Sequence, residues 1–171
     1  MDPLLILLRI VHIGSAMIWF GGAVIGTFYL SPVGKALGPS AQPFLDAMTR
    51  RGMGILFPLV ATLTVLSGLG LYWRDSGGLQ LAWITTPSGL AFTAGGLAAV
   101  VSLVGGFILI GPSMAEQSAV NNELALVGGG APDAGQQARL DRADRRMQLA
   151  TRIDFPLIVF AALTMAVGRY L

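Results

Sequence analysis

Long apolar stretches alternate with short polar connections along this chain. About 20 apolar residues in helical form cross a bilayer core about 30 Å thick. Four stretches reach that length, at residues 4–30, 53–73, 89–111 and 149–170. The pattern predicts an all-α protein, a bundle of four transmembrane helices that forms a single integral membrane domain over residues 1–171.

The connections carry patterns of their own. Between the first two spans, a Pro/Gly-rich turn leads into a predicted short amphipathic helix, with Phe44 and Met48 opposite Asp46 and Arg51. Such a helix is expected to lie at the membrane interface. The third connection contains the tract GGGAPDAG, which is typical of flexible linkers. We therefore expect a flexible cytoplasmic loop at about 113–147.

Composition agrees with a membrane protein. Hydrophobic residues make up 54% of the chain and charged residues 12%, whereas soluble domains carry about 25% charged residues. The first apolar run is too long for the roughly 7–15 residues of a signal-peptide core, so we expect it to stay in the bilayer. The absence of cysteine excludes disulfides and thiolate chemistry. A net charge of +2 gives no reason to expect nucleic-acid binding.

The distribution of basic residues predicts orientation. The first and third connections hold eight of the eleven lysines and arginines, and the positive-inside rule places both connections in the cytoplasm. The termini then lie outside. An outer aromatic belt is expected from Tyr72, Trp73, Trp83 and Tyr170. We expect an integral protein of a prokaryotic-type inner (plasma) membrane.

A weak internal repeat is visible in the helix-breaking residues. Gly26 and Pro32 in the first half have the same spacing as Gly106 and Pro112 in the second. The tripeptide Phe-Pro-Leu at 57–59 recurs at 155–157, and each copy is followed at equal distance by Gly and Tyr. Two helical hairpins related by a pseudo-twofold axis along the membrane normal would explain this. A chance likeness between apolar sequences is the alternative.

The only histidine, His12, lies inside the first span. It is about eight residues from the outer end of that span, so roughly 12 Å deep. Arg9, Ser15 and Trp19 share its helix face. Ionisable groups inside a membrane are functional by default, and neutral imidazole is a common ligand of haem iron. Alternatively, His12 forms a hydrogen bond across a close helix pair.

Three arginines are candidates for binding the propionate groups of a haem. Arg9, Arg74 and Arg169 all lie toward the outer face and would pair with propionates. Because the chain has no second histidine, a haem iron would be five-coordinate, would take Met or water as its sixth ligand, or would be shared between protomers. The candidate cofactor-binding residues are His12, which is also the candidate metal ligand, Arg9, Ser15, Trp19, Arg74 and Arg169.

Other chemistries lack their motifs. The chain has no P-loop, no HExxH, no Ser–His–acid set and no paired carboxylates within the spans. Met17 and Met165 lie well inside spans, but they do not recur at helical spacing and are interpreted as core filler rather than copper ligands.

Short motifs resemble a known family. His12-Ile13, Trp-Phe-Gly-Gly at 19–22 and Tyr-Leu-Ser-Pro at 29–32, with Asp-Phe-Pro at 154–156, resemble the small membrane proteins of the HemJ type and their CopD-like relatives. The resemblance implies haem b and oxidation of protoporphyrinogen IX, with His12 matching the first-helix histidine, or copper handling. The family's further histidine or lysine positions are missing from 89–112.

Two functions follow from these observations. The first is a haem-b-binding membrane protein in electron transfer or porphyrin chemistry, which as an enzyme would be a HemJ-like oxidoreductase. The alternative is a non-enzymatic, oligomeric accessory or transport-like protein, with a possible copper role, in which His12 makes interhelical hydrogen bonds. The expected partners are the lipid bilayer, further copies of the chain in a homo-oligomer and a redox partner of unknown identity.

Overall fold

The protein is all-helical. A computed structural model describes residues 2–171, apart from the side chain of residue 39. Within that range there is no strand, and four helices are long and apolar enough to cross a membrane: Pro3–Leu37, Met53–Asp75, Pro87–Leu126 and Ala134–Gly168. The predicted all-α class with four helices of transmembrane length is confirmed.

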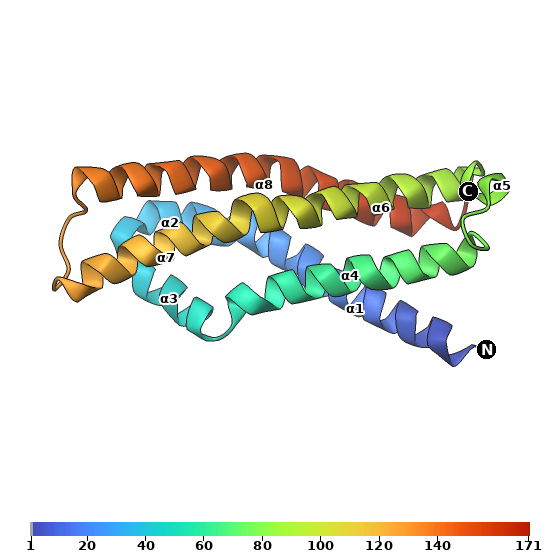
Figure 1. Cartoon of the computed structure of the whole chain (residues 1–171), viewed down its shortest axis with the longest axis horizontal. Helices are drawn as coiled ribbons and strands as arrows, with labels where there is room; N and C mark the ends of the chain where they lie inside the picture. Colours follow the sequence, from blue (N-terminus) through green and yellow to red (C-terminus); the bar gives the residue numbers. More distant parts are fainter. Residues whose placement is uncertain (1) are drawn as a thin grey trace. The chain divides into compact units, whose positions relative to one another are not determined.

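The chain divides into two compact units. The first contains the described residues up to Leu103 together with Phe155–Leu171, and the second is Val104–Asp154. In the first unit, both chain termini lie at the same end as the short helix α5 (Leu81–Ile84), whereas α3 (Gln42–Arg50) lies toward the other end (Figure 1).

The first long helix begins at a well-formed cap and runs further than its sequence indicates. The Asp2 side chain accepts a hydrogen bond of 2.9 Å from the Leu4 amide, which caps α1 (Pro3–Ile25). The helix then continues through a π-helical segment, η1 (Gly26–Leu30), into α2 (Ser31–Leu37). The turn expected directly after the first span is therefore wrong.

The proline explains the π-helical segment. In a regular α-helix the Pro32 ring would collide with the carbonyl four residues earlier. Instead, the Ser31 amide donates to the carbonyl of Gly26, which is five residues earlier rather than the usual four. The wider turn that results accommodates the proline ring. The chain can thus stay helical through Pro32.

The third long helix repeats this arrangement. A second π-helical segment, η3 (Gly106–Ile110), joins α6 (Pro87–Gly105) to α7 (Gly111–Leu126), and the Gly111 amide donates to the Gly106 carbonyl. Each π-helical segment begins at a glycine and is followed by a residue and then a proline. This backbone likeness supports the internal repeat.

A glycine makes the corner that leads into the second long helix. After η2 (Gly38–Ala41), α3 ends at Arg50, and Gly52 follows with φ at +91°. This left-handed conformation is readily adopted only by glycine. Helix α4 (Met53–Asp75) starts at the next residue. The amphipathic helix expected here is present as α3, but its position at a membrane interface stays a prediction.

The second unit is helical over most of the range in which we expected the third loop. We expected a flexible loop at 113–147, but α7 extends to Leu126 and α8 (Ala134–Gly168) begins only a short turn later. Asp133 and Gln136 cap α8 reciprocally, because the Gln136 amide donates to Asp133 Oδ1 (2.8 Å) and the Asp133 amide to Gln136 Oε1 (3.1 Å).

Charged and small residues hold this second unit together. The Arg139 guanidinium donates to Glu116, and to Glu123 at 2.8 and 2.9 Å. The hydrogen bond from Arg139 lowers the pKa of Glu123. Beneath these pairs, Val120 is fully buried and Ala143 nearly so. The polar residues that indicated a loop thus form the facing surfaces of a helical hairpin.

The first unit has small residues inside and large apolar residues outside. The buried positions of α4 are Val60, Ala61, Thr64, Val65 and Ser67. On α1, in contrast, Met17 is 70% exposed and Ile10 is 64% exposed. Small residues let helices approach closely in lipid, where large apolar side chains face the acyl chains. This arrangement agrees with the membrane-spanning length of the helices.

Two residues of the expected outer belt, Tyr72 and Trp83, belong to an aromatic cluster. Tyr72 and Trp83 meet edge to face at 5.4 Å, and Trp83 stacks with Phe92 at 6.3 Å. The Tyr72 hydroxyl is also hydrogen-bonded to Thr93. These contacts connect α4, α5 and α6. Trp73 and Tyr170 are exposed.

Candidate functional site

His12 is bonded to the neighbouring helix through one ring nitrogen. Its Nδ1 lies 2.8 Å from the Thr64 carbonyl oxygen of α4. A carbonyl oxygen only accepts hydrogen bonds, so Nδ1 carries the hydrogen and donates it. In the neutral ring, the lone pair is then on Nε2. The bond therefore fixes both the tautomer and the orientation of the imidazole.

The second nitrogen of His12 is accessible. Nε2 has no hydrogen-bond partner, although the residue is half-buried. Among the described residues, every buried side-chain nitrogen or oxygen atom has a partner. Nε2 is therefore not fully buried, and the described residues leave its lone pair without a hydrogen bond.

Gly68 provides the surface on which the imidazole lies. A Cβ atom at residue 68 would stand 2.8 Å from Cε1 and 3.1 Å from Nδ1 of His12, but 3.8 Å from Nε2. Carbon and nitrogen atoms do not approach this closely without a shift, so any larger residue would push the ring away. Nε2 is the ring nitrogen further from α4.

Ser15 supports the helix pair one turn beyond His12. Its hydroxyl donates to the Val11 carbonyl (2.6 Å) and accepts from the Thr64 hydroxyl (2.8 Å). Thr64 thus contacts α1 twice, through its carbonyl at His12 and through its side chain at Ser15. The buried Ser15 faces α4, and its partners are protein groups.

The arginines predicted for the site are distributed along the first unit. Arg9 is exposed on α1, one turn before His12. Arg74 is ion-paired with Asp2 at 2.6 Å, and Asp2 precedes His12 by ten positions, roughly 15 Å of helix. Arg169 lies over the ring of Tyr170 at 5.6 Å. Arg9 is within one turn of His12 on the same helix.

Trp19 completes the predicted set. It is half-buried on α1, seven residues after His12, which places it on the same helix face. Thr64 and Gly68 were not predicted from the sequence. Their pattern, Thr-x-x-x-Gly in α4, is a usable signal, because small residues four apart mark a close helix contact.

The helix pair α6–α8 in the first unit packs in the same way as the α1–α4 pair, but without a histidine. A Cβ at Gly168 would lie 3.1 Å from the ring of Phe92, and a Cβ at Gly95 would overlap the Thr164 hydroxyl. His12 and Ser15 on α1 thus correspond to Phe92 and Gly95 on α6, each shifted by 80 positions. Thr64 and Gly68 correspond to Thr164 and Gly168, each shifted by 100 positions.

This correspondence corrects the alignment drawn from the sequence. The Phe-Pro-Leu tripeptides are 98 positions apart, whereas the packed Thr-x-x-x-Gly motifs are 100 apart. The helix contacts define the structural equivalence, because they fix which residues face each other. Phe92 therefore occupies the position equivalent to His12, which agrees with the offset of 80 positions between Pro32 and Pro112.

The described residues contain no group of three or more His, Cys, Asp or Glu side chains placed to hold a metal ion. At His12 the chain itself offers a single nitrogen. No protein-family model, curated protein or solved structure matches the chain. The function is therefore inferred from the geometry of this site.

Proposed function

We propose that the protein is an integral membrane protein that binds haem b, with Nε2 of His12 as an axial ligand of the iron. The observation that carries the proposal is the 2.8 Å hydrogen bond between Nδ1 and the Thr64 carbonyl. Histidine ligands commonly donate their other ring N–H to a backbone carbonyl, which orients the ring and raises its basicity.

Haem suits a site with one protein ligand. A bare metal ion needs three or four donors from the protein, whereas the porphyrin supplies four nitrogens and leaves only axial positions. When bound, haem b supplies one-electron redox chemistry, which favours electron transfer or porphyrin chemistry at the membrane. The resemblance of the motif around His12 to HemJ-type proteins supports the same assignment.

The neighbours of His12 have separate tasks in this proposal. Arg9 is exposed one turn away and is the cation best placed for a propionate. Trp19 borders the same face of α1. Gly68 and Thr64 hold the imidazole, and Ser15 holds the two helices together. Arg74 and Arg169 have partners of their own in the first unit, so they have a smaller part in the proposal.

The sixth coordination position is left to water, a methionine or a second protomer. The chain has one histidine, and bis-imidazole coordination would therefore require a homo-oligomer. The membrane placement also belongs to this proposal: the first and third connections in the cytoplasm, both termini outside and α3 at the interface. We assign the protein to an inner (plasma) membrane of the prokaryotic type.

Absorption spectroscopy tests the haem proposal directly. Detergent-purified protein reconstituted with haemin is expected to show a Soret band and reduced b-type bands. His12→Ala should abolish them, and imidazole added to His12→Gly should restore them. Phe92→Ala is the matched control, because it removes the ring from the equivalent contact in the second helix pair. A colourless protein that does not respond to haemin would overturn the proposal.

A specific observation also favours the non-enzymatic alternative. Phe92 fills the position equivalent to His12 by packing alone, so the imidazole could serve only to join α1 and α4. Interhelical hydrogen bonds in membranes average about 0.6 kcal/mol. Under this alternative, His12→Phe would keep the oligomer, and neither the wild type nor the variant would show a cofactor spectrum. Stoichiometric copper binding that depends on His12 would instead support a copper role.

A further inference from the structure

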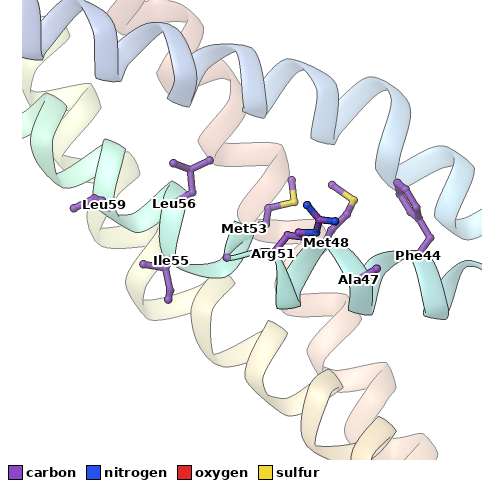
Figure 2. Close-up of a pocket in the computed structure, with 9 residues that line it drawn as sticks. Phe44, Ala47, Met48, Arg51, Met53, Ile55, Leu56 and Leu59 are labelled. Atoms are coloured by element: carbon purple, nitrogen blue, oxygen red, sulfur yellow. The ribbon is translucent and has the colours of Figure 1, made fainter.

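A groove lies at the corner between α3 and α4. Its volume is about 630 Å³, and it is lined by residues of α3, by Arg51 and Gly52, and by the first two turns of α4. Phe44, Met48, Met53 and Leu56 point to one side of this corner, and the Arg51 side chain lies between the two methionines (Figure 2). The groove is thus apolar with one cation.

The charge at the groove is not neutralised by the protein. No ion pair joins Arg50 or Arg51 to a carboxylate of residues 2–171. The nearest acid in α3, Asp46, accepts a 2.9 Å hydrogen bond from Gln42. The Arg51 guanidinium at the groove therefore remains available for an anion.

The order of these residues along the chain resembles the order of groups in a lipid. Arg51 comes first, followed by Met53, Leu56 and Leu59 on α4. From Met53 to Leu59 the helix rises about 9 Å. Because α4 is long and apolar enough to span a membrane, its first residues lie where headgroups meet acyl chains. A phosphate would face Arg51, and an acyl chain would follow the apolar lining inward.

We propose that this groove binds one anionic phospholipid, with the phosphate at Arg51 and an acyl chain between the apolar residues of α3 and α4. Its volume lies within the usual range of about 300–1,000 Å³ for small-ligand sites. Charge complementarity favours a lipid of net negative charge over a zwitterionic one. The proposal rests on the membrane-spanning assignment of α4 and is independent of haem at His12.

Native mass spectrometry of the full chain in detergent tests this proposal. Phosphatidylglycerol and phosphatidylcholine with the same acyl chains are added separately, and free inorganic phosphate is the third arm. We expect one phosphatidylglycerol to be retained about fivefold to tenfold more tightly than phosphatidylcholine. Equal retention of the two lipids, or equal competition by inorganic phosphate at the same concentration, would overturn the proposal.

Three variants locate the site. Arg51→Gln should reduce phosphatidylglycerol retention about fivefold. Lys35→Gln is the charge-matched control, because Lys35 lies in α2, near the end of the first long helix, and does not line the groove. Ala47→Trp fills the groove and should reduce retention of both lipids. Equal effects of Arg51→Gln and Lys35→Gln would indicate non-specific attraction and contradict the site. Size-exclusion chromatography and circular dichroism check that each variant is folded.

Discussion

The imidazole of His12 lies directly on the backbone of Gly68, where a Cβ atom would come within 2.8 Å of Cε1. This contact brings Nδ1 to the Thr64 carbonyl and leaves Nε2 as the ring nitrogen further from Gly68, without a hydrogen bond. One glycine on α4 therefore determines how the only histidine of the chain is presented.

Gly68→Ala is expected to displace the His12 ring and break its bond to Thr64. The added methyl group should cost about 1–3 kcal/mol, as overpacking of a close contact does, and weaken haem binding. Thermal unfolding in detergent measures the first effect and a haemin titration the second. Gly54→Ala, also on α4, is the control because nothing lies within 4 Å of a Cβ there. Equal behaviour of the two variants would show that the contact is unimportant.

Gly22→Ala should destabilise the α1–α4 pair, whereas Gly21→Ala should not. A Cβ at Gly22 would overlap the Phe57 ring, while a Cβ at Gly21 meets nothing within 4 Å. The expected difference in unfolding free energy is about 1–3 kcal/mol. Because the two glycines are adjacent in one helix, helix propensity cancels in the comparison. A difference near zero would mean that Phe57 moves aside freely.

His12→Phe is expected to preserve folding and abolish haem binding. Phe92 packs on Gly168 in the second helix pair, so a phenyl ring fits this kind of contact, and the lost hydrogen bond should cost only about 0.6 kcal/mol. Thermal unfolding of the apoprotein and a haemin titration measure the two effects separately. A variant that unfolds or aggregates would indicate that the hydrogen bond between His12 and Thr64 is required to hold α1 and α4 together.

The hairpin of the second unit should lose stability in acid. The hydrogen bond from Arg139 lowers the pKa of Glu123 in the folded state, so the folded protein releases this proton more readily than the unfolded chain. The resulting stabilisation is present above the ordinary carboxyl pKa and is lost as the pH falls below about 4. Both side chains are partly exposed to solvent, so the effect is small.

Thermal unfolding of the wild type and Glu123→Gln between pH 7 and pH 3 measures this effect. The wild type should be the more stable at neutral pH, and the difference should disappear in acid. Asp141→Asn is the control, because Asp141 accepts from Gln137 rather than from a cation. A difference that persists unchanged at pH 3 would exclude the Glu123–Arg139 pair as its source.

The apolar periodicity was sufficient to predict the four long helices, because membrane-spanning length follows from hydrophobicity alone. It could not predict that the first and third helices continue through Pro32 and Pro112. A proline normally ends or kinks a helix, and the π-helical turns that accommodate these two depend on hydrogen bonds five residues apart. The same limitation hid α7, whereas the tract GGGAPDAG indicated a loop much longer than the short turn that joins α7 to α8.

The candidate site was predictable only on its own helix. Periodicity placed Arg9, Ser15 and Trp19 with His12, since spacing within one helix fixes a shared face. The partners on α4 could not be found in this way, because the register between two helices depends on how their small residues interlock. Thr64 meets both His12 and Ser15 only because Gly68 lets α1 approach.

The separation of His12 from Thr64 along the chain matters during biosynthesis. The two residues are 52 positions apart, and at 5–20 residues per second the ribosome needs about 3–10 s to synthesise the intervening chain. For that time α1 has emerged without the helix that orients its histidine. The imidazole acquires its fixed orientation only once α4 packs against α1, so under the proposed function cofactor loading at His12 follows the arrival of the second helix.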